Sequence, residues 1–391
     1  MKNAGKIEKN VFFLGLTSFF NDLSSEMIFP ILPAFMAEVL GIPKSLIGLI
    51  DGIAKSTASI LKVFSGYISD RLGKRKALAV FGYSLSTVVK PILSITRNWV
   101  AVLCVRVGDR IGKGIRTAPR DALIAASSQE KHRGRSFGFH RAMDTLGALL
   151  GTIFTFLLLS VVLSGPVEHR YRLVFLLAAI PAVIGVGFIV FGVKERKDIP
   201  PSKRVKLSWK MMPVNLRIFI VAAVIFGLGN FTFTFFLLRI RTMGIPAAIV
   251  PLVYLVYNVV YFLGSYPAGV ASDKFSKKKI LAFGFGAYIL TAIGFALLNA
   301  PVWAWFLMAV YGFHMAFTDG IARALVSDLA PVEIRGTALG MYHTGIGIVD
   351  LPSGLLAGFL WDAISPQAVF IVGAVIALVA LCVLFVVRES K

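Results

Sequence analysis

Long apolar runs constrain this chain more than any other feature of its sequence. Stretches of about 20 residues with few charges recur along nearly all of the 391 residues, and a helix of that length crosses the hydrocarbon core of a bilayer. Hydrophobic residues make up 57% of the chain and charged residues only 16%, below the share of about 25% that is usual in water-soluble domains. The sequence therefore predicts an all-α membrane protein.

The apolar runs divide into twelve predicted transmembrane helices, which are bounded by glycine, proline or charge. Their approximate ranges are 11–37, 45–69, 77–97, 99–127, 134–163, 171–193, 215–239, 246–271, 278–298, 301–328, 336–362 and 366–388. A hydrophilic segment with two prolines and many charges separates six helices from six. We therefore expect an N-terminal six-helix bundle over 1–193, a cytoplasmic linker over 194–213 and a C-terminal six-helix bundle over 214–391.

Basic residues are distributed unevenly between the two sets of loops. The loops on the side of both termini carry 24 Lys and Arg, and the opposite loops carry six. Because cytoplasmic loops collect positive charge, we expect a multi-pass protein of the cytoplasmic (inner) membrane with both termini in the cytoplasm. A net charge of +21 would suit nucleic acid in a soluble protein, but the hydropathy favours the lipid bilayer as partner and argues against nucleic acid.

Two short motifs occur at corresponding places in the predicted halves. Residues 66–76 read GYISDRLGKRK, and residues 269–279, which lie 203 positions later, read GVASDKFSKKK. Residues 133–138 read RGRSFG, and residues 335–340, which lie 202 positions later, read RGTALG. Two local matches at nearly one displacement indicate duplicated, pseudo-symmetric six-helix units.

With these motifs the chain resembles the major facilitator superfamily over essentially its whole length. The family's characteristic loop between helices two and three is present in nearly full form, and its second copy has Ser276 in place of the second glycine. The resemblance implies a secondary transporter of the proton-coupled antiporter or drug-exporter kind, in which two bundles rock about a central solute site. The predicted gating residues are Gly66, Asp70, Arg71 and Gly73 in the first copy and Gly269 and Asp273 in the second.

In that family the loop aspartate holds a cytoplasmic gate shut against the start of helix eleven. Here Asp70 would face the region of Gly336, and by pseudo-symmetry Asp273 would face the region of Gly134. A carboxylate is stabilised at the positive end of a helix dipole, and a glycine lets a neighbouring helix approach closely. The alternative is that the basic tail of the motif only sets the membrane orientation.

Charged residues also recur inside the predicted helices, where each one costs about 2.5–3.5 kcal/mol at the bilayer centre. Helix four carries a stripe at spacings of 3 and 4 that runs from Arg106 to Arg120, and Asp109 is expected to pair with Lys113 and Arg106. The stripe resembles the arginine-bearing fourth helix of proton antiporters in this superfamily. We expect Lys113 and Arg116 to reach a hydrated cavity; salt bridges within the protein are the equal alternative.

Helix one carries two carboxylates one helical turn apart, just before a pair of prolines. Acidic residues at this depth can take up protons, or they can simply neutralise the stripe of helix four. Histidines at 140, 314 and 343 and a tyrosine stripe at 254, 257 and 261 are further candidates, with core packing as the alternative reading. The predicted solute and proton pathway consists of Asp22, Glu26, Lys62, Arg110, Lys113, Arg116, Arg120, Arg141, Asp144, Asp319, Arg323 and Asp350.

The excess of basic residues in the first half favours a small solute with an anionic group, moved by proton-coupled alternating access. Its rival is a proton-driven efflux pump for amphipathic compounds, in which the acids bind cations and the basic stripe is internally paired. A transport-inactive membrane sensor is an alternative of another class. The expected partners are the solute, protons and the bilayer, and we expect a monomer.

An enzymatic function is not expected. The chain has no nucleophile elbow, no HExxH motif and no GxxxxGK[ST] phosphate loop. Its two cysteines lie in apolar runs, and the histidines lack metal-ligand spacing. We therefore expect no cofactor and no metal site.

The gating motif gives a first prediction. Asp70→Asn keeps the size of the side chain but removes the charge that would face the helix dipole, so transport should stop while membrane insertion stays intact. Solute uptake by cells, measured beside the amount of full-length protein in the membrane fraction, tests this. Normal transport by the variant would remove the gating role.

Overall fold

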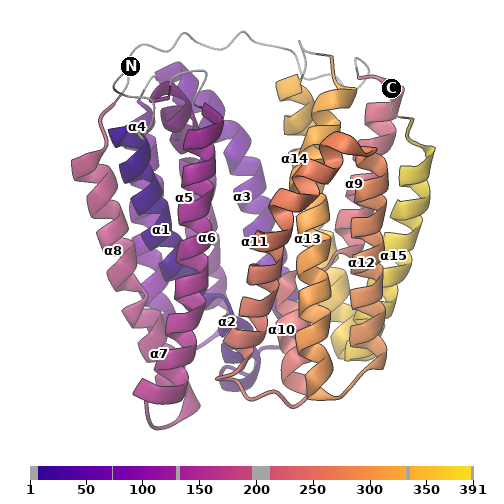
Figure 1. Cartoon of the computed structure of the whole chain (residues 1–391). Helices are drawn as coiled ribbons and strands as arrows, with labels where there is room; N and C mark the ends of the chain where they lie inside the picture. Colours follow the sequence, from indigo (N-terminus) through magenta and orange to yellow (C-terminus); the bar gives the residue numbers. More distant parts are fainter. Residues whose placement is uncertain (1–7, 73, 129–132, 196–211, 332–334, 389–391) are drawn as a thin grey trace. The chain divides into compact units, whose positions relative to one another are not determined.

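The computed structural model describes residues 8–72, 74–128, 133–195, 212–331 and 335–388, and every regular element in these ranges is a helix (Figure 1). Eight helical segments of the described chain are long and apolar enough to cross a membrane. Four further helices of 20 to 29 residues do not reach that apolarity: α1 (Lys9–Ile28), α3 (Lys44–Leu72), α5 (Trp99–Ala126) and α13 (Pro301–Leu329). Together these segments match the twelve predicted ranges, so the predicted fold class is confirmed.

Nine of the twelve predicted pathway residues lie on these four less apolar helices. The exceptions are Arg141 and Asp144 on α6 (Arg133–Leu157) and Asp350 on α14 (Arg335–Ala363). A charge is tolerated at membrane depth only where protein or water surrounds it, so the charges gather on a few helices while the others keep their apolar surfaces.

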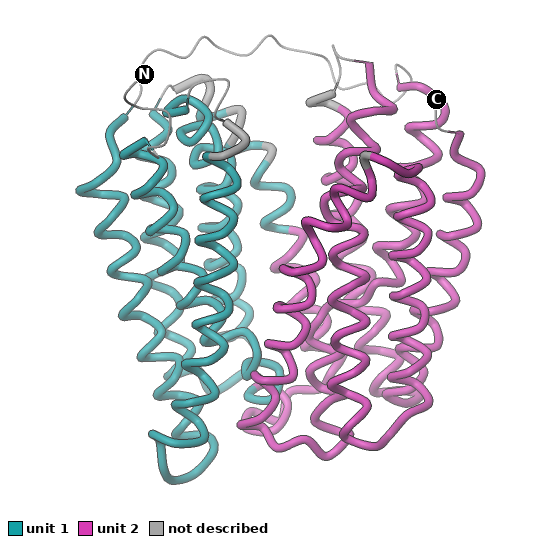
Figure 2. The backbone as a smooth tube through the Cα atoms, in the orientation of Figure 1, with its two compact units in different colours: residues 1–35, 57–203 teal, residues 36–56, 204–391 magenta. Residues whose placement is uncertain are grey.

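Contacts divide the chain into two compact units, which Figure 2 shows in two colours. Unit 1 comprises residues 1–35 and 57–203, and unit 2 comprises residues 36–56 and 204–391. Helix α3 therefore contributes its first half to unit 2 and its second half to unit 1. The predicted linker 194–213 falls mostly on residues 196–211, which lie outside the described residues.

Unit 1 contains most of the first six spans. Besides α1, α5 and the second half of α3, its elements are α2 (Leu32–Ala34), α4 (Arg75–Val89), η2 (Lys90–Ile95), α6, η4 (Leu158–Val162), α7 (Val167–Leu177), α8 (Ala179–Gly187) and η5 (Phe188–Gly192), and η1 (Phe35–Val39) leads out of it. Unit 2 adds α9 (Val214–Gly229), α10 (Phe233–Thr242), α11 (Val250–Lys274), α12 (Lys277–Leu297), α13, α14 and α15 (Pro366–Val386).

The same packing scheme is repeated within each unit. In unit 1, α1 packs against α6 and α8, and α4 packs against α5. In unit 2, the corresponding helix α9 packs against α14 and α15, and α12 packs against α13. Since these pairs stand in the same order in each half of the chain, the structure agrees with the duplication that the two repeated motifs indicate.

Two spans are interrupted. The first span breaks after Ile28, because Pro30 and Pro33 cannot donate backbone hydrogen bonds to a continuing helix. The seventh span breaks between α9 and α10, where Tyr288 donates a 2.6 Å hydrogen bond to the carbonyl of Gly229. The carboxylate of Asp51 accepts hydrogen bonds from Thr232 and Thr234 at the start of α10, and a carboxylate is favourable at a helix N-terminus. The sequence predicts the first break but not the second.

Glycines let several helices meet backbone to backbone. A Cβ atom on Gly147 or Gly151 of α6 would collide with the carbonyl oxygens of Phe19 and Leu23 on α1. In contrast, a Cβ atom on Gly138, in the first turns of α6, would meet no atom within 4 Å. Close approach of this kind is how helices associate in a bilayer, where burial of apolar surface supplies little driving force for association.

These glycines give a matched pair of variants on one helix. Gly147→Ala forces α1 and α6 apart and should destabilise the protein by about 1–3 kcal/mol. Gly138→Ala should leave stability unchanged or raise it by up to about 1 kcal/mol, because alanine favours helix. Thermal unfolding of the purified protein in detergent compares the two, and equal melting temperatures would contradict the close α1–α6 contact.

Candidate functional site

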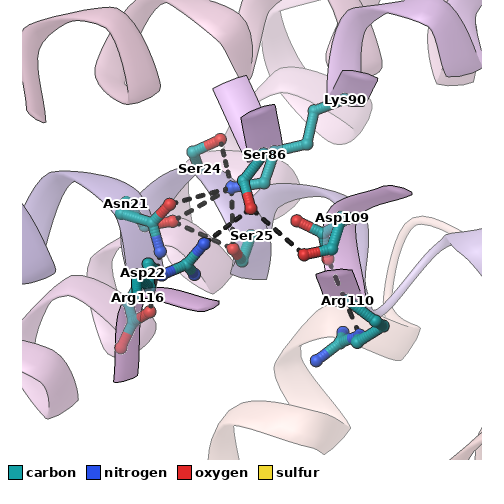
Figure 3. Close-up of polar contacts among 9 residues, drawn as sticks. All are labelled: Asn21, Asp22, Ser24, Ser25, Ser86, Lys90, Asp109, Arg110 and Arg116. Carbon is teal, nitrogen blue, oxygen red and sulfur yellow. Dashed lines mark hydrogen bonds and ion pairs between the residues drawn. The ribbon is translucent and has the colours of Figure 1, made fainter. Parts of the chain in front are cut away.

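The polar side chains of unit 1 gather where α1, α4 and α5 meet (Figure 3). Arg116 of α5 is only 4% exposed and donates a 2.6 Å hydrogen bond to the hydroxyl of Ser86 on α4. Its guanidinium carbon lies 4.6 Å from the centroid of the Tyr83 ring, which is within the range of a cation–π contact. Ser86 in turn donates to the backbone carbonyl of Asp109 at 3.1 Å. Arg116 is thus held by α4 rather than by a carboxylate.

Glycines bring these two helices close enough for that contact. A Cβ atom on Gly82 would lie 2.6 Å from the carbonyl oxygen of Gly112, and a Cβ atom on Gly112 would lie 2.6 Å from the Ser86 hydroxyl. Gly114 faces α3 instead, where Ser65 donates to its carbonyl oxygen at 2.9 Å. The glycines that flank Lys113 therefore position α5 between α4 and α3.

The other basic residues of the α5 stripe differ in their partners. Arg110 lies 3.6 Å from the carboxylate of Asp109, and Arg120 lies 2.8 Å from that of Asp121. The expected pair between Asp109 and Lys113 does not form, because the neighbouring Arg110 takes the carboxylate. Lys113 is exposed; Thr117 donates a 2.6 Å hydrogen bond to its backbone carbonyl, but within the described residues its ammonium group makes no hydrogen bond or ion pair. It is the stripe residue that is most open to a ligand.

The carboxylates of α1 and α6 face this stripe. Asp22 is half-buried and accepts a 3.3 Å hydrogen bond from the amide of Asn21, and Glu26, also half-buried, lies one turn further along α1. On α6, the buried His140 lies 3.6 Å from Asp144. The charges that act on Asp22 come from α5 and α6, namely Lys113, Arg116, Arg120 and Asp144.

Two further predicted basic residues of unit 1 are exposed. Lys62 lies on α3 and Arg141 lies on α6, and both take part in polar interactions. Lys62 is among the charges that act on Lys113. Electrostatic interactions thus connect Asp22, Lys62, Arg110, Lys113, Arg116, Arg120 and Asp144, and Arg141 acts on His140, which lies beside Asp144.

In unit 2, the predicted pathway residues Asp319 and Arg323 of α13 form an ion pair, with Arg323 2.7 Å from Asp319. Tyr261 of α11 donates a 2.8 Å hydrogen bond to the same carboxylate. Asp350 is half-buried on α14 and has polar interactions of its own. The sequence places Asp319 and Arg323 one turn apart, but their tyrosine partner follows only from the packing of α11 against α13.

The tyrosine stripe of α11 continues into an aromatic cluster within unit 2. The rings of Tyr257 and Tyr311 are 5.5 Å apart, and Phe233, next to the α9–α10 break, lies 4.9 Å from Tyr257. His314 is 1% exposed and its Nδ1 lies 2.9 Å from the carbonyl oxygen of Gly284, so it is a packing residue of the core. This agrees with the core-packing alternative for the histidine.

The gating motifs are described only in part. Gly66, Asp70 and Arg71 lie on α3 and Asp273 lies on α11, but the surroundings of Gly66 and the side chains of the other three are outside the described part of the structure, as is Gly73 as a whole. Gly269 is described, and a Cβ atom added to it would meet no atom within 4 Å. The predicted gate therefore stays a prediction.

Sequence reasoning missed the surroundings of Lys90. This lysine, 3% exposed at the start of η2, donates hydrogen bonds to Asn21, Ser24 and Ser25 of α1 (Figure 3). Serine and asparagine give no distinctive pattern in a sequence, but a lysine in the middle of an apolar run is a signal that can be read. Among the described residues, no group of three or more His, Cys, Asp and Glu side chains is suited to hold a metal ion.

The family model of the Major Facilitator Superfamily matches residues 14–352 and 243–391. The chain belongs to this superfamily. An uncharacterised transporter of the superfamily from Methanocaldococcus jannaschii is 38% identical over 398 residues, covering 98% of this chain and 96% of that protein. The inner membrane transport protein YajR of Escherichia coli is 25% identical and covers 93% of this chain and 80% of its own length.

Among solved structures, the nucleoside transporter NupG shares the fold, with a TM-score of 0.78 and 16% identity over 97% of this chain and 99% of that chain. Membership of the superfamily makes this chain a multi-pass membrane transporter rather than an enzyme. At such identities the relatives do not identify the solute, so its chemistry has to be argued from the side chains.

Proposed function

We propose that this protein is a secondary transporter that moves a small anionic solute across the cytoplasmic membrane by proton-coupled alternating access. The proposal rests on the exposed, unpaired ammonium group of Lys113 among the described residues. Its side chain is exposed, it is flanked by two buried glycines, and its ammonium group has no ion pair or hydrogen bond within the described residues. An ammonium group in this setting is a point charge ready for a carboxylate or phosphate.

The surroundings of Lys113 support an anion rather than a cation. Arg110, Lys62 and Arg116 all act on it with like charge, and Asp22 is its main opposing charge. A solute anion that joined this group would relieve repulsion among the cations, and a solute cation would add to it. Arg116 is buried about one turn further along α5, where it contributes positive potential without direct contact.

Proton coupling is supported by the acids of α1. Asp22 interacts electrostatically with Lys113, Arg116 and Arg120 of the basic stripe, and Glu26 lies one turn further along α1, so a change in protonation of Asp22 would alter the charge of the solute site. We further propose that residues 1–193 and 214–391 rock as two bundles about the linker 194–213. In this proposal both termini lie in the cytoplasm, the protein acts as a monomer, and the two loop motifs gate the cytoplasmic side.

A second candidate function is efflux of amphipathic compounds. It is favoured by the ion pairs of Arg110 with Asp109 and of Arg120 with Asp121, which neutralise part of the stripe. In that case Asp22 and Glu26 would bind a cationic solute. The two candidates differ in the role of Lys113, which an efflux pump for cations does not need.

Lys113→Gln tests the first candidate. Loss of a hydrogen bond to a charged group costs about 1.5–3 kcal/mol, so the KM for an anionic solute should rise about tenfold or more. Uptake of labelled succinate, citrate, benzoate and glucose 6-phosphate into proteoliposomes measures this, and Lys113→Arg should keep most of the activity.

Arg97→Gln is the matched control, because Arg97 is also basic and exposed but lies between η2 and α5, outside the helices. It should transport like the wild type. Unchanged KM values in Lys113→Gln would exclude the anion site. Transport of ethidium but of none of the four anions would favour the efflux candidate instead.

A further inference from the structure

Lys90 is a buried ammonium group whose hydrogen-bond partners are all uncharged. Its Nζ donates to the hydroxyl oxygens of Ser25 at 2.9 Å and Ser24 at 3.2 Å, and to the side-chain and backbone oxygens of Asn21 at 3.4 Å. All four acceptors come from one turn of α1 (Figure 3). Within the described residues, no carboxylate lies within salt-bridge distance of this nitrogen.

These four acceptor oxygens can satisfy both protonation states of lysine. The three N–H groups of the ammonium are satisfied by the four oxygens. After loss of one proton, two N–H groups and a lone pair remain, and a serine hydroxyl can rotate to donate to that lone pair. Ser25 now donates to the backbone carbonyl of Asn21 at 3.0 Å, and its hydroxyl would turn from that carbonyl to donate to the neutral amine. A carboxylate partner would have fixed the charge; the neutral partners leave it free to change.

Charges of both signs surround Lys90 at longer range. Asp22 of α1 and Asp109 of α5 favour its charged form, and Arg110 and Arg116 of α5 oppose it. Helix α7 packs against η2, and its Arg172 donates to the carbonyls of Ser94 in η2 and of Thr96 while it pairs with Glu168. Arg170 donates to the Leu159 carbonyl, and His169 is exposed. The basic residues of α4, Arg75 and Lys76, lie at its opposite end. A change in the charge of Asp22 therefore alters the electrostatic environment of Lys90.

A hydrogen-bonded bridge connects Lys90 to the proposed solute site. The side-chain oxygen of Asn21 accepts from Lys90, and its amide nitrogen donates to Asp22 at 3.3 Å. The charge of Lys113 acts on Asp22 in turn. Arrival of an anion at Lys113 would therefore change the electrostatic environment of Lys90 through the Asp22 carboxylate and the Asn21 side-chain amide.

We propose that Lys90 binds and releases the coupling proton of the transport cycle. In the loaded state Nζ carries three N–H bonds. On release one N–H bond breaks, the proton passes to water or to the Asp22 carboxylate, and the electron pair stays on nitrogen. The inference rests on the proposed proton-coupled transport and assigns its proton to a lysine of α4–η2 rather than to an acid.

Lys90→Arg is the decisive variant, because arginine keeps the positive charge and the donors but does not release a proton. Solute exchange between equal pools, measured with whichever of labelled succinate, citrate, benzoate or glucose 6-phosphate the wild type carries, should continue. Accumulation driven by an imposed gradient of about one pH unit should fall from about tenfold per coupled proton to none. Lys278→Arg, in which the lysine of α12 that donates to the Val387 carbonyl is replaced, is the control and should accumulate solute like the wild type.

A second readout needs no solute. Thermal unfolding of the purified protein, followed from about pH 5 to about pH 10, should show a pH-dependent component that both Lys90→Arg and Lys90→Met lack. If Lys90 only anchors α1, Lys90→Arg will follow the wild-type curve and will accumulate solute normally, and the proposal fails. Exchange of none of the four anions by the wild type would instead contradict the proposed function, and the unfolding curves would still decide the role of Lys90.

Discussion

An ionisable side chain at membrane depth needs a partner or water, and this constraint organises the whole structure. Hydrocarbon cannot solvate a charge, so each one has to be satisfied within the helix packing or at a hydrated surface. Most of the predicted pathway charges lie on α1, α3, α5 and α13, and the remaining ones lie on α6 and α14. Arg116 against Tyr83 and Ser86, Arg323 against Asp319, and Lys90 against the hydroxyls of α1 are three solutions to the same problem.

The close approach of helices makes these solutions available. Glycines on α4, α5 and α6 remove the side chains that would keep the backbones apart, and short polar side chains then reach across. Ser86 links two helices because Gly82 and Gly112 let α4 and α5 touch. In unit 1 the packing that holds the bundle together also positions the charges that define its chemistry.

The sequence predicted the helices well, because a span of about 20 apolar residues is a local property and its ends carry clear signals. It also places Asp319 and Arg323 one turn apart on a shared face, which is where their ion pair forms. It did not predict that Arg110 takes the carboxylate of Asp109, that Arg116 is buried under a tyrosine, or that α9 ends at Gly229. These depend on which neighbouring helix packs on which face, and spacing along one chain carries no information about that.

The described basic residues differ in whether a carboxylate satisfies their charge within the protein. Arg110, Arg120 and Arg323 have carboxylate partners, whereas Lys113 is exposed among like charges. Superfamily membership establishes transport, and this difference supports an anionic solute. The glycines on either side of Lys113 and the carboxylate of Asp22 then become parts of a solute site rather than of a sealed core.

Water accessibility of residue 113 is the most direct test. With the free and exposed Cys104 and Cys382 replaced by serine, a cysteine at position 113 can be treated with a charged, membrane-impermeant thiol reagent that reacts with the thiolate in water. A cysteine in place of Val183, an exposed apolar residue of α8, serves as the lipid-facing reference. Fast labelling at 113 with slow labelling at 183 is the predicted result. Labelling at 113 as slow as at 183 would mean that Lys113 faces lipid, and the anion site would be excluded.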